Sequence, residues 1–578
     1  MTEINAPPHS RAPQAESHMN QKKLRIGLLL DGHTTSAWAL EMLKSIQSSE
    51  HSEIVVGIMP KATPAQPRPF VKRLLANLPS LGPIVTRKAL DLFYEKVLER
   101  NTYIRPSEAS SNIRTLLPNL PFIEVQPIRT KWSDSFSAVD LERIQEYKLD
   151  VLLRLGFRIL RGGILTAARH GVWSFHHGDN IINRGGPPGF WESMEEWPET
   201  GAVLQILTED LDNGKILSRT FSCTNWASVR DNKRNYFWKT LSLIPRKLAE
   251  LHRVGPETFF SNVEQENATP ALYSRRLYTS PTNWEYTKLL ARKTARKIRE
   301  IIKNQFYIDQ WILMYDIRPT LSSSLWRYKK MLPPIDRFWA DPHLIERNGT
   351  YYIFIEELIY QRGRGHISVI EMDKQGNYKS PVPVLERPYH LSYPFIFEYE
   401  GDLYMIPESA QNGTIELYQC TRFPDQWTFV HNLMENVKAY DCTLLQQDGR
   451  WWLFANMVET EGASSWDELY IFSSDTPLSQ TWQAHANNPV ISDCKNARPA
   501  GRPFTYQGQT YRPSQNCSVR YGYGFNLARI EALTQSTYKE EMVTRVTPDW
   551  DPALVATHTF SRCGQLHVID AQLRRRKH

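Results

Sequence analysis

Three side chains near the middle of the chain could carry acid–base chemistry. Ser174 and His176 end one apolar segment, and Asp212 follows a second, Ala202 to Leu207. Short apolar runs bounded by turn residues indicate buried strands of an α/β sheet, whose ligands bind beyond the carboxyl ends of the strands. An imidazole that a carboxylate orients is a general base. These residues predict proton transfer to and from an attacking amine, with a core histidine beside a turn aspartate as the structural alternative.

The order of the motifs in this region resembles the formyltransferase family that uses 10-formyltetrahydrofolate. His176, the loop Arg184-Gly185-Gly186-Pro187 and the stretch Leu211-Asp212-Asn213-Gly214 match its pattern by position. The resemblance implies that His176 is the base, Asp212 its partner and 10-formyltetrahydrofolate the cofactor. Ser174 stands where the family has an Asn that donates to the oxyanion, a bond typically worth roughly a hundredfold in rate. The predicted substrate and cofactor loop comprises His177, Asp179, Asn180, Arg184, Gly185, Gly186, Asn213 and Gly214.

The elements that must position these residues occupy residues 22–260. Leu24 to Asp31 and Glu53 to Met59 are apolar runs that indicate buried strands, and Trp38 to Ile46 between them indicates an amphipathic helix. A strand–helix–strand opening is typical of a doubly wound sheet. We therefore expect a formyltransferase-like α/β domain of the Rossmann type, preceded by a disordered leader at residues 1–21.

Two segments of the chain are basic and amphipathic. Arg87 to Glu99 lies within this domain, and Tyr286 to Phe306 follows it, in a region (residues 261–310) that predicts a linker and a helix. Such helices can lie on a membrane surface, whereas packing against a core or between domains is their more common role. The sequence thus leaves a peripheral membrane contact open.

Composition narrows the class of protein and of partner. The 578 residues carry a formal net charge of +7, which permits an anionic ligand such as a nucleotide sugar but does not demand nucleic acid. The six cysteines show no zinc-binding spacing, so we expect reduced thiols and no metal site. No apolar run approaches the ~18 residues of a transmembrane helix. We expect a cytoplasmic protein, and the sequence leaves its oligomeric state open.

The second half of the chain, residues 311–573, contains a repeat. Five turn glycines recur every 48 to 59 residues, each with an apolar residue four positions before it and a ring three positions after it: Gly349, Gly401, Gly449, Gly508 and Gly564. Five strand–turn–strand units predict an all-β five-bladed β-propeller, with a β-sandwich as the alternative.

Acidic residues occupy equivalent positions of this repeat. Asp341 and Asp441 lie eight residues before their glycines, and Glu356 and Glu408 lie seven after theirs. Symmetry should bring them toward the central axis, and the segment around Asp341 resembles the first-blade Asp-Pro of five-bladed furanosidase-type glycosidases. That resemblance implies a base or nucleophile, an acid and a third carboxylate, as glycosidic bond cleavage requires. Alternatively, these acids cap strands of the blades or form salt bridges with Arg498, Arg502 and Arg512, or the site binds sugar without cleaving it.

Several long motifs of this half also resemble the N-terminal domain of plant glucosamine inositolphosphorylceramide transferases. They include HLSYPFIFEYEGDLYMIPES at residues 390–409 and RPAGRPFTYQGQTYRPSQ at residues 498–515. The resemblance covers roughly residues 325–550 and implies a propeller that handles sugars or glycolipids.

Two predictions of function follow. In the first, the N-terminal domain transfers a formyl or related one-carbon or acyl group to the amine of an amino sugar or nucleotide sugar, in polysaccharide or glycolipid biosynthesis. In the second, the propeller is a glycosidase or glycan transferase and the first domain a degenerate scaffold. A non-enzymatic assembly factor that binds glycans is the third reading.

Overall fold

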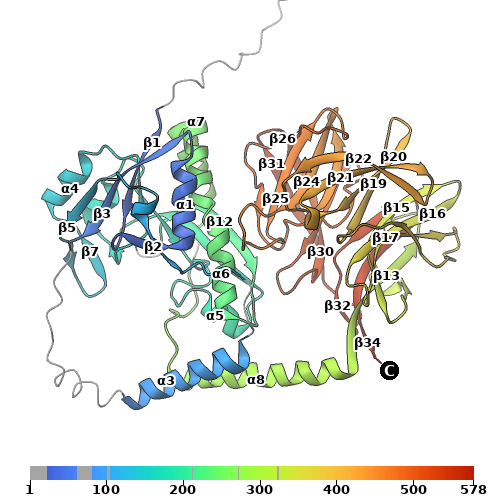
Figure 1. Ribbon diagram of the computed structural model, residues 1–578, viewed down its shortest axis with the longest axis horizontal. Helices are drawn as coiled ribbons and strands as arrows, with labels where there is room; N and C mark the ends of the chain where they lie inside the picture. The colour runs from blue at the N-terminus through green and yellow to red at the C-terminus, as the bar shows by residue number, and fades with distance from the viewer. Residues whose placement is uncertain are drawn as a thin grey trace, which may run out of the picture.

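The computed structural model describes residues 22–61, 81–99, 104–210, 213–270, 272–321 and 324–577. It has two lobes that lie side by side, an N-terminal lobe and a β-rich C-terminal lobe (Figure 1). The long helix α8 (Asn283–Phe306) runs below both and leads directly into strand β13 (Tyr307–Ile317) of the second lobe. The predicted helix of residues 286–306 therefore connects the lobes without a break.

A seven-stranded sheet forms the centre of the N-terminal lobe, in the order β12-β11-β10-β8-β1-β3-β5. The five strands from β10 to β5 are parallel, and β11 and β12 run antiparallel at one edge. The strands are β1 (Leu24–Leu29), β3 (Ser52–Pro60), β5 (Phe122–Val125), β8 (Val151–Arg154), β10 (Val172–His176), β11 (Glu199–Ile206) and β12 (Lys215–Cys223). Two small sheets accompany it, formed by β2 (Thr34–Ser36) with β4 (Ser110–Asn112), and by β6 (Ile128–Arg129), β7 (Ser133–Ser135) and β9 (Ile159–Leu160).

Apolar side chains alternate between the two faces of this sheet and bury a helix layer on each. Leu28 packs in one cluster with Trp38 of α1 (Ala37–Gln47) and Leu248 of α7 (Leu243–Glu266). The adjacent Leu29 packs in the other cluster with Ile144 of α4 (Ala138–Gln145). Further helices are α3 (Leu81–Phe93), η2 (Tyr94–Leu98), η3 (Ile113–Thr115), η4 (Gly162–Thr166), α5 (Phe190–Glu195) and α6 (Val229–Thr240).

The predicted α/β formyltransferase-like domain of the Rossmann type is wrong for this lobe. Two of the seven strands are antiparallel, and the crossover from β8 to β10 contains the 3-10 helix η4 in place of an α-helix. Over the described residues of the whole molecule, strands far outnumber helices. The error has a physical cause: an apolar run such as Ala202–Leu207 indicates burial on both faces of a sheet but not the direction of the strand.

The C-terminal lobe consists of five sheets that close into a ring, a five-bladed β-propeller (Figure 1). Ile312 and Ala571 pack against Phe525 of the neighbouring blade, and Trp452 and Ile530 join another pair of blades. The ring closes because β13 pairs along its whole length with the C-terminal strand β34 (Leu566–Arg576). The blade that contains this pair also has β14 (Lys329–Met331), β32 (Leu554–Ala556) and β33 (Phe560–Cys563).

The other four blades follow in chain order. The short helix η5 (Leu325–Arg327) lies between β13 and β14 of the ring-closing blade, and η6 (Ala410–Asn412) lies within the second of these four blades. The first contains β15 (Arg337–Arg347), β16 (Thr350–Ile359), β17 (Gly365–Met372) and β18 (Val382–Leu385), and the second β19 (Ser392–Tyr399), β20 (Asp402–Glu408), β21 (Thr414–Arg422) and β22 (Gln426–Glu435). The third contains β23 (Ala439–Gln447), β24 (Arg450–Met457), β25 (Glu468–Ser474), β26 (Gln483–Ala484) and β27 (Ile491–Ser492), and the fourth β28 (Phe504–Tyr506), β29 (Gln509–Asn516), β30 (Gly524–Leu533) and β31 (Tyr538–Val546).

The repeated glycines make the first turn of each of these four blades. Both central residues of the turn have a positive φ, as in the type I′ turns that suit the twist of β-hairpins. The pairs are Asn348-Gly349, Glu400-Gly401, Asp448-Gly449 and Gln507-Gly508. The sequence repeat therefore marks a backbone requirement that recurs once per blade.

Candidate functional site

A bulge recurs in the innermost strand of three blades and determines which side chains reach the axis. The pairing register shifts after Ala340, Ser392 and Tyr440, in β15, β19 and β23. Next to these shifts, Asp341, Tyr393 and Asp441 have φ values of 52°, 43° and 52°. A left-handed conformation at a residue other than glycine is strained and persists where the surroundings enforce it, often at functional sites.

The bulges surround a cavity of about 230 Å³ at the propeller axis. Three carboxyl groups line it, from Asp341 of β15, Glu356 of β16 and Glu408 of β20. The other lining residues are basic, aromatic or small: Arg498, His390, His558, Trp311, Phe338, Tyr440, Tyr521, Ala340 and Ser392. The cavity thus combines acid–base groups with rings on which a sugar could stack.

Asp441 lies behind this lining, in a buried ion pair with Arg498. The Arg498 guanidinium donates from Nε to Asp441 Oδ2 at 2.5 Å and from Nη2 to Oδ1 at 3.1 Å. Gln515 adds a hydrogen bond to Asp441 Oδ2 at 2.7 Å. Burial opposes the charge of Arg498, but Asp441 raises the pKa of this guanidinium well above its ordinary value. The pair places a fixed positive charge at the wall of the cavity.

A second basic side chain, His558, lies between two acids, Asp570 of the ring-closing blade and Asp341 of the first blade. Its Nδ1 lies 2.7 Å from Asp570 Oδ2, and its Nε2 lies 3.5 Å from Asp341 Oδ1. Burial alone would lower the pKa of His558, yet Asp570 and Asp341 raise it. The imidazole also stacks on Trp311, with ring centroids 4.2 Å apart. The two acids therefore favour the protonated form of His558, and Asp341 lies next to it.

The three lining carboxyl groups have raised pKa values. Burial raises the pKa of Asp341 well above its ordinary value, Asp441 and Glu356 add to this, and His558 opposes it. Burial, Glu408 and Asp441 raise the pKa of Glu356. Burial and Asp441 also raise the pKa of Glu408, whose oxygens accept hydrogen bonds from the Ser392 hydroxyl and the Ala410 amide, both at 2.8 Å. Groups with such values can hold a proton near neutral pH.

His390 fixes the orientation of Glu356. The Gly365 amide donates to His390 Nδ1 at 2.9 Å, so the neutral ring carries its proton on Nε2. That nitrogen lies 3.3 Å from Glu356 Oε1. Burial lowers the pKa of His390, which favours this neutral form.

Two groups of possible metal ligands lie among the described residues, each with its ligand atoms within 4.8 Å of one another. They are Asp341, His558 and Asp570, and Glu199, Asp493 and Cys494. In the first group, His558 and the Thr559 hydroxyl already bond to Asp570. We interpret this group as an ion-pair network, and the expectation of no metal stays a prediction.

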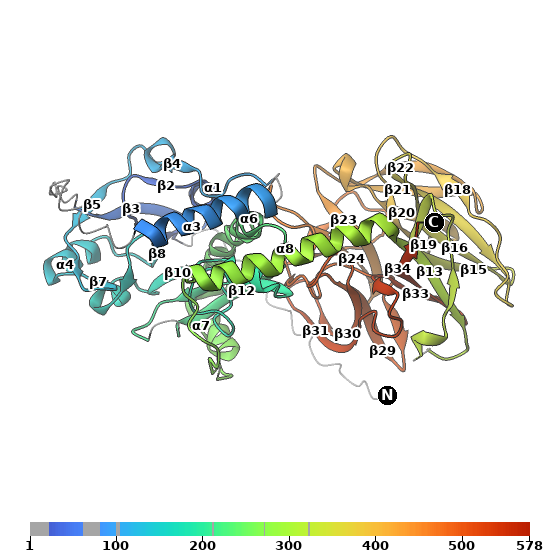
Figure 2. The ribbon, with the colours of Figure 1, turned by 90° about the horizontal axis from the view of Figure 1, so that it is seen from below.

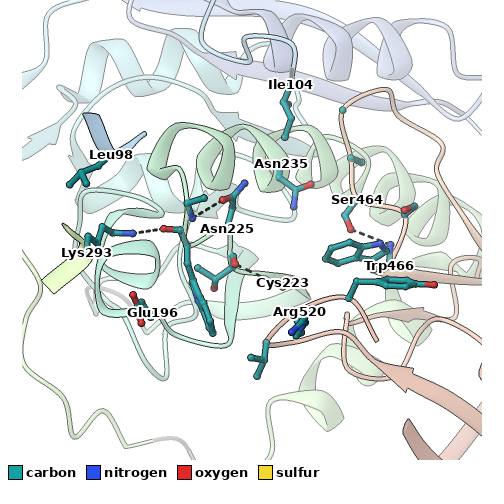
Figure 3. A pocket seen from close by; sticks show the side chains of 18 of the residues that line it. Leu98, Ile104, Glu196, Cys223, Asn225, Asn235, Lys293, Ser464, Trp466 and Arg520 are labelled. Carbon is teal, nitrogen blue, oxygen red and sulfur yellow. Dashed lines mark hydrogen bonds between the residues drawn. The ribbon is translucent and has the colours of Figure 1, made fainter. Parts of the chain in front are cut away.

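A larger cavity of about 800 Å³ lies between the lobes (Figure 3). Trp226 and Lys293 line it from the N-terminal lobe and α8, and Trp466, Arg520 and Tyr521 line it from propeller loops. Tyr521 also lines the axial cavity, so the two spaces adjoin at this residue. The interlobe cavity is therefore a vestibule beside the axial site.

Lys293 is the buried cation of this vestibule. Its ammonium group donates to the Trp226 carbonyl, and burial lowers its pKa to about 8. Figure 3 shows its side chain on one wall and those of Trp466 and Arg520 on the other. Arg520 donates to Gln572 Oε1 at 2.8 Å. Cationic and aromatic groups thus face each other across the space between the lobes.

The structure brings two of the three residues predicted for amine acylation into one cavity. Ser174 and His176 line a space of about 150 Å³ together with Gly214. Ser174 accepts a hydrogen bond from Arg154 Nη1 and donates one to the Phe175 carbonyl, both at 3.2 Å, and His176 Nε2 lies 2.8 Å from the Asn183 carbonyl. Asp212 lies outside the described residues. Ligand cavities usually measure about 300–1,000 Å³, so this one is small for 10-formyltetrahydrofolate, which stays a prediction.

The remaining residues of the predicted loop have structural contacts. His177 is buried in an aromatic cluster, 4.0 Å from the Phe237 ring, and burial lowers its pKa to about 3. Asp179 accepts a hydrogen bond from the Ile181 amide at 3.1 Å, and Asn180 donates one to Gln205 at 3.1 Å.

The loop glycines pack against a distant segment of the chain. A Cβ on Gly185 would lie 1.8 Å from the Tyr278 carbonyl oxygen, which accepts a hydrogen bond from the Gly186 amide at 3.0 Å. The Arg184 guanidinium lies 5.0 Å from the centre of the Tyr273 ring, and the Asn213 amide donates to the Asp210 carbonyl at 3.3 Å. These contacts anchor the loop to residues 273–278.

Arg502 does not line the axial cavity. Its guanidinium donates to the Ile396 carbonyl and lies 4.9 Å from the centre of the Phe395 ring. Sequence reasoning missed His390, His558 and Asp570, because the first two lie in connections between strands and the third has no acidic equivalent in the other repeats. Both histidines could have been found from the sequence, because each lies next to a predicted inner strand.

Comparisons with known proteins match the propeller half. The family model described as "Glucosamine inositolphosphorylceramide transferase 1, N-terminal" matches residues 330–556. Glucosamine inositolphosphorylceramide transferase 1 of Oryza sativa subsp. japonica is 38% identical over 206 residues, which cover 35% of this chain and 27% of that protein. The protein of the same name from Arabidopsis thaliana is 29% identical over 245 residues, 39% of this chain and 32% of that protein. The chain thus spans about a third or less of the length of these relatives.

These matches confirm the resemblance of the propeller half and give no support to a formyltransferase. Among solved structures, the catalytic domain of the Coprinopsis cinerea GH62 α-L-arabinofuranosidase is similar with a TM-score of 0.32 and 11% identity, over 46% of this chain and 97% of that one. A TM-score this low supports no argument about function. The printed name of these relatives describes them as transferases.

Proposed function

We propose that the protein acts on a glycan at the propeller axis, by cleaving a glycosidic bond and passing the glycosyl group to water or to another acceptor. The observation that carries this proposal is the gathering of carboxyl groups in one cavity, from Asp341, Glu356 and Glu408, with Asp441 and Arg498 directly behind them. The printed name of the plant relatives supports a glycan or glycolipid as the substrate class.

Glycosidic bond chemistry needs one protonated acid and one carboxylate that acts as base or nucleophile. We assign the acid to Glu408, whose pKa is raised by burial and by the neighbouring Asp441 against the opposing charge of Arg498. We assign the base to Asp341 from its contact with His558, whose Nε2 lies 3.5 Å from Asp341 Oδ1 and which opposes the effect of burial on the pKa of this carboxyl. In this assignment Glu408 donates a proton to the leaving oxygen. Asp341 either activates the acceptor or attacks the sugar directly.

The size of the cavities suggests how a substrate binds. About 230 Å³ is less than a usual ligand pocket and suits a single sugar unit, with Tyr440 and Tyr521 as stacking partners. The rest of the glycan would extend past Tyr521 into the interlobe cavity, whose volume of about 800 Å³ lies within the usual range. On this proposal the N-terminal lobe completes the substrate-binding site.

Turnover and binding measurements on the full chain test the proposal. The purified protein is incubated with a panel of 4-nitrophenyl pyranosides and furanosides, with and without oligosaccharide acceptors. Glu408→Gln and Asp341→Asn should each lower turnover at least a hundredfold, because a neutral amide can neither donate the proton nor act as base. Calorimetry should show that both variants still bind the glycan.

The half-buried Asp373, which lies outside the cavity at the start of a turn, offers a matched control, and Asp373→Asn should leave turnover unchanged. Unaltered turnover in both cavity variants would contradict the assignment of roles. Glycan binding without turnover by the natural chain would contradict catalysis and leave a glycan-binding protein.

A further inference from the structure

Helices α3 and α8 form the lower face of the molecule. They contact each other and lie side by side as the outermost layer when the molecule is seen from below (Figure 2). α8 has 24 residues, which makes it about 36 Å long. Among the described residues, no helix is long and apolar enough to cross a membrane.

One side of α8 is exposed along the whole helix and is rich in apolar residues. Trp284, Ile298, Ile302 and Phe306 are 52% to 68% exposed. Together with other exposed side chains they follow the i, i+4, i+7 spacing of one helix stripe: Trp284, Lys288, Ala291, Ala295, Ile298, Ile302 and Phe306. Large apolar side chains aligned in this way on a surface mark an interaction site.

α3 presents the same combination of residues. Ile84, Val85 and Leu92 are 44%, 62% and 57% exposed, and Lys88 lies between them on the helix surface. Because α3 packs alongside α8, the two stripes extend one surface. We call the exposed residues of α3, η2 and α8 the helical face.

The helical face is positively charged. Its exposed cations are Lys88, Lys96, Lys288, Arg292 and Arg299.

The acids of these helices do not neutralise this charge. Asp91 pairs with Arg87, and Glu285 and Glu300 pair with Arg276 and Arg296. Among the described residues of the face, Glu95 is the one exposed acid without an ion pair.

We propose that the helical face binds the surface of an anionic lipid bilayer. A helix that lies in the membrane interface has apolar residues on one side and Lys and Arg beside them, and Trp is enriched at that depth. Lys288 lies 4.9 Å from the centre of the Trp284 ring, so a cation and an interfacial ring occupy one end of the stripe. The core of a protein–protein interface is depleted in charged residues such as Lys, whereas cations interspersed with single apolar side chains suit lipid headgroups.

Docking in this way would place the vestibule at the membrane. Lys293, Arg296 and Lys297 line the interlobe cavity from the side of α8 opposite the exposed stripe. A glycolipid headgroup in the bilayer could therefore enter beside α8. This consequence rests on the proposed function, while membrane docking itself does not.

Co-sedimentation of the full chain with lipid vesicles tests the proposal. The protein should bind vesicles of phosphatidylcholine and phosphatidylserine, and bind vesicles of phosphatidylcholine alone at least tenfold more weakly. The triple variant Lys288→Glu, Arg292→Glu, Arg299→Glu should lose at least tenfold in binding to the anionic vesicles. Ile298→Ser with Ile302→Ser should also weaken binding, because the apolar contact is lost.

A charge-matched control is available on other surfaces: Lys131→Glu, Arg364→Glu and Arg545→Glu replace exposed cations outside the helical face. This control should bind anionic vesicles as the natural chain does. Equal loss in both triple variants would overturn the proposal, as would no binding to anionic vesicles. A dimer in light scattering that the isoleucine variant abolishes, without vesicle binding, would show that a second copy covers the face. Because all substituted side chains are exposed, thermal melts should show that every variant is folded.

Discussion

Asp441 and Arg498 show how individual residues hold the axial site together. Their side chains are almost fully buried, and each charge has the other as its main partner. A charge left alone in such a place is strongly unfavourable, typically by about 3–5 kcal/mol when one partner is removed. The ion pair thus stabilises the blade and also places the Arg498 charge at the wall of the cavity.

We predict that Arg498→Met lowers the free energy of unfolding by about 3–5 kcal/mol, because Asp441 loses the cation that compensates its burial. Urea denaturation of the full chain measures this. Arg422, which pairs with Asp425 on the surface, is the matched control, and Arg422→Met should have no measurable effect. Similar losses in the two variants would show that burial does not determine the strength of the pair.

The buried carboxyl group of Glu356 should make the stability of the protein depend on pH. Its pKa is raised in the folded protein, so folding favours its protonated form. The stability that comes from this shift is complete below the ordinary carboxyl pKa of about 4.3 and is lost as the pH rises through the higher folded value. Glu356→Gln keeps a neutral, similarly shaped group at every pH.

The melting temperature of Glu356→Gln relative to the natural chain should therefore increase from pH 4 to pH 8. Thermal melts across this range measure the difference, with Glu142→Gln on an exposed helix surface as the control. A difference that stays constant or decreases with pH would contradict a raised pKa at Glu356.

The sequence predicts part of this chemistry. The repeat register places Asp341 and Asp441 at one position and Glu356 and Glu408 at another, which is enough to expect them near the axis. It also offers Arg498, Arg502 and Arg512 as salt-bridge partners of these acids, but it does not show that Arg498 pairs with Asp441 while Arg502 turns to the Ile396 carbonyl. Such choices depend on packing between blades, which one chain's periodicity does not contain.

At the scale of elements, the inner strands depend on unusual backbone conformations. The left-handed residues Asp341, Tyr393 and Asp441 recur in three blades, and at the next blade Gly501 has a φ of 133°. The Gly501 amide donates to the Tyr393 hydroxyl at 2.7 Å. This glycine therefore connects the fourth blade to the second across the axis.

Gly501→Ala should destabilise the protein by roughly 3 kcal/mol or more, since backbone strain and overpacking each contribute about 1–3 kcal/mol. A Cβ at this position would lie 2.0 Å from the Phe560 carbonyl oxygen. Gly32→Ala, where a Cβ meets nothing within 4 Å, is the control. Chemical denaturation measures both, and a neutral Gly501→Ala would show that the strand can shift to admit the methyl group.

Elements differ in how far the sequence determines them. The turn glycines recur with ring and apolar partners, so the five-bladed architecture can be read from one chain. The direction of β11 could not be predicted in the same way: the apolar run Ala202–Leu207 predicts a strand there, but buried apolar runs look alike in parallel and antiparallel pairs. Long-range pairing, such as that of β13 with β34, also leaves no local signal.

At the scale of the whole molecule, buried polar contacts join the two lobes. Lys239 of α6 lies 3.3 Å from Asp467 of the propeller, and both side chains are inaccessible to solvent. Arg246 of α7 pairs with Glu468 at 2.9 Å, and the Ser222 hydroxyl donates to Asp467 at 2.5 Å. The ion-pair partners of these charges lie across the interface, while Lys239 also donates to the Phe221 carbonyl and Glu468 also accepts a hydrogen bond from Ser492 within their own lobes.

We therefore predict that the natural chain unfolds in one cooperative calorimetric transition, although lobes of this size often melt separately. Lys239→Met together with Arg246→Met removes both cations and leaves Asp467 and Glu468 without their cross-lobe ion pairs. This double variant should show two transitions, with the first at a lower temperature than in the natural chain. Lys44→Met with Lys330→Met, which removes two cations from ion pairs within single lobes, should keep one transition. Two transitions in the natural chain would mean that the lobes are independent, and the vestibule between them would then open and close as they move.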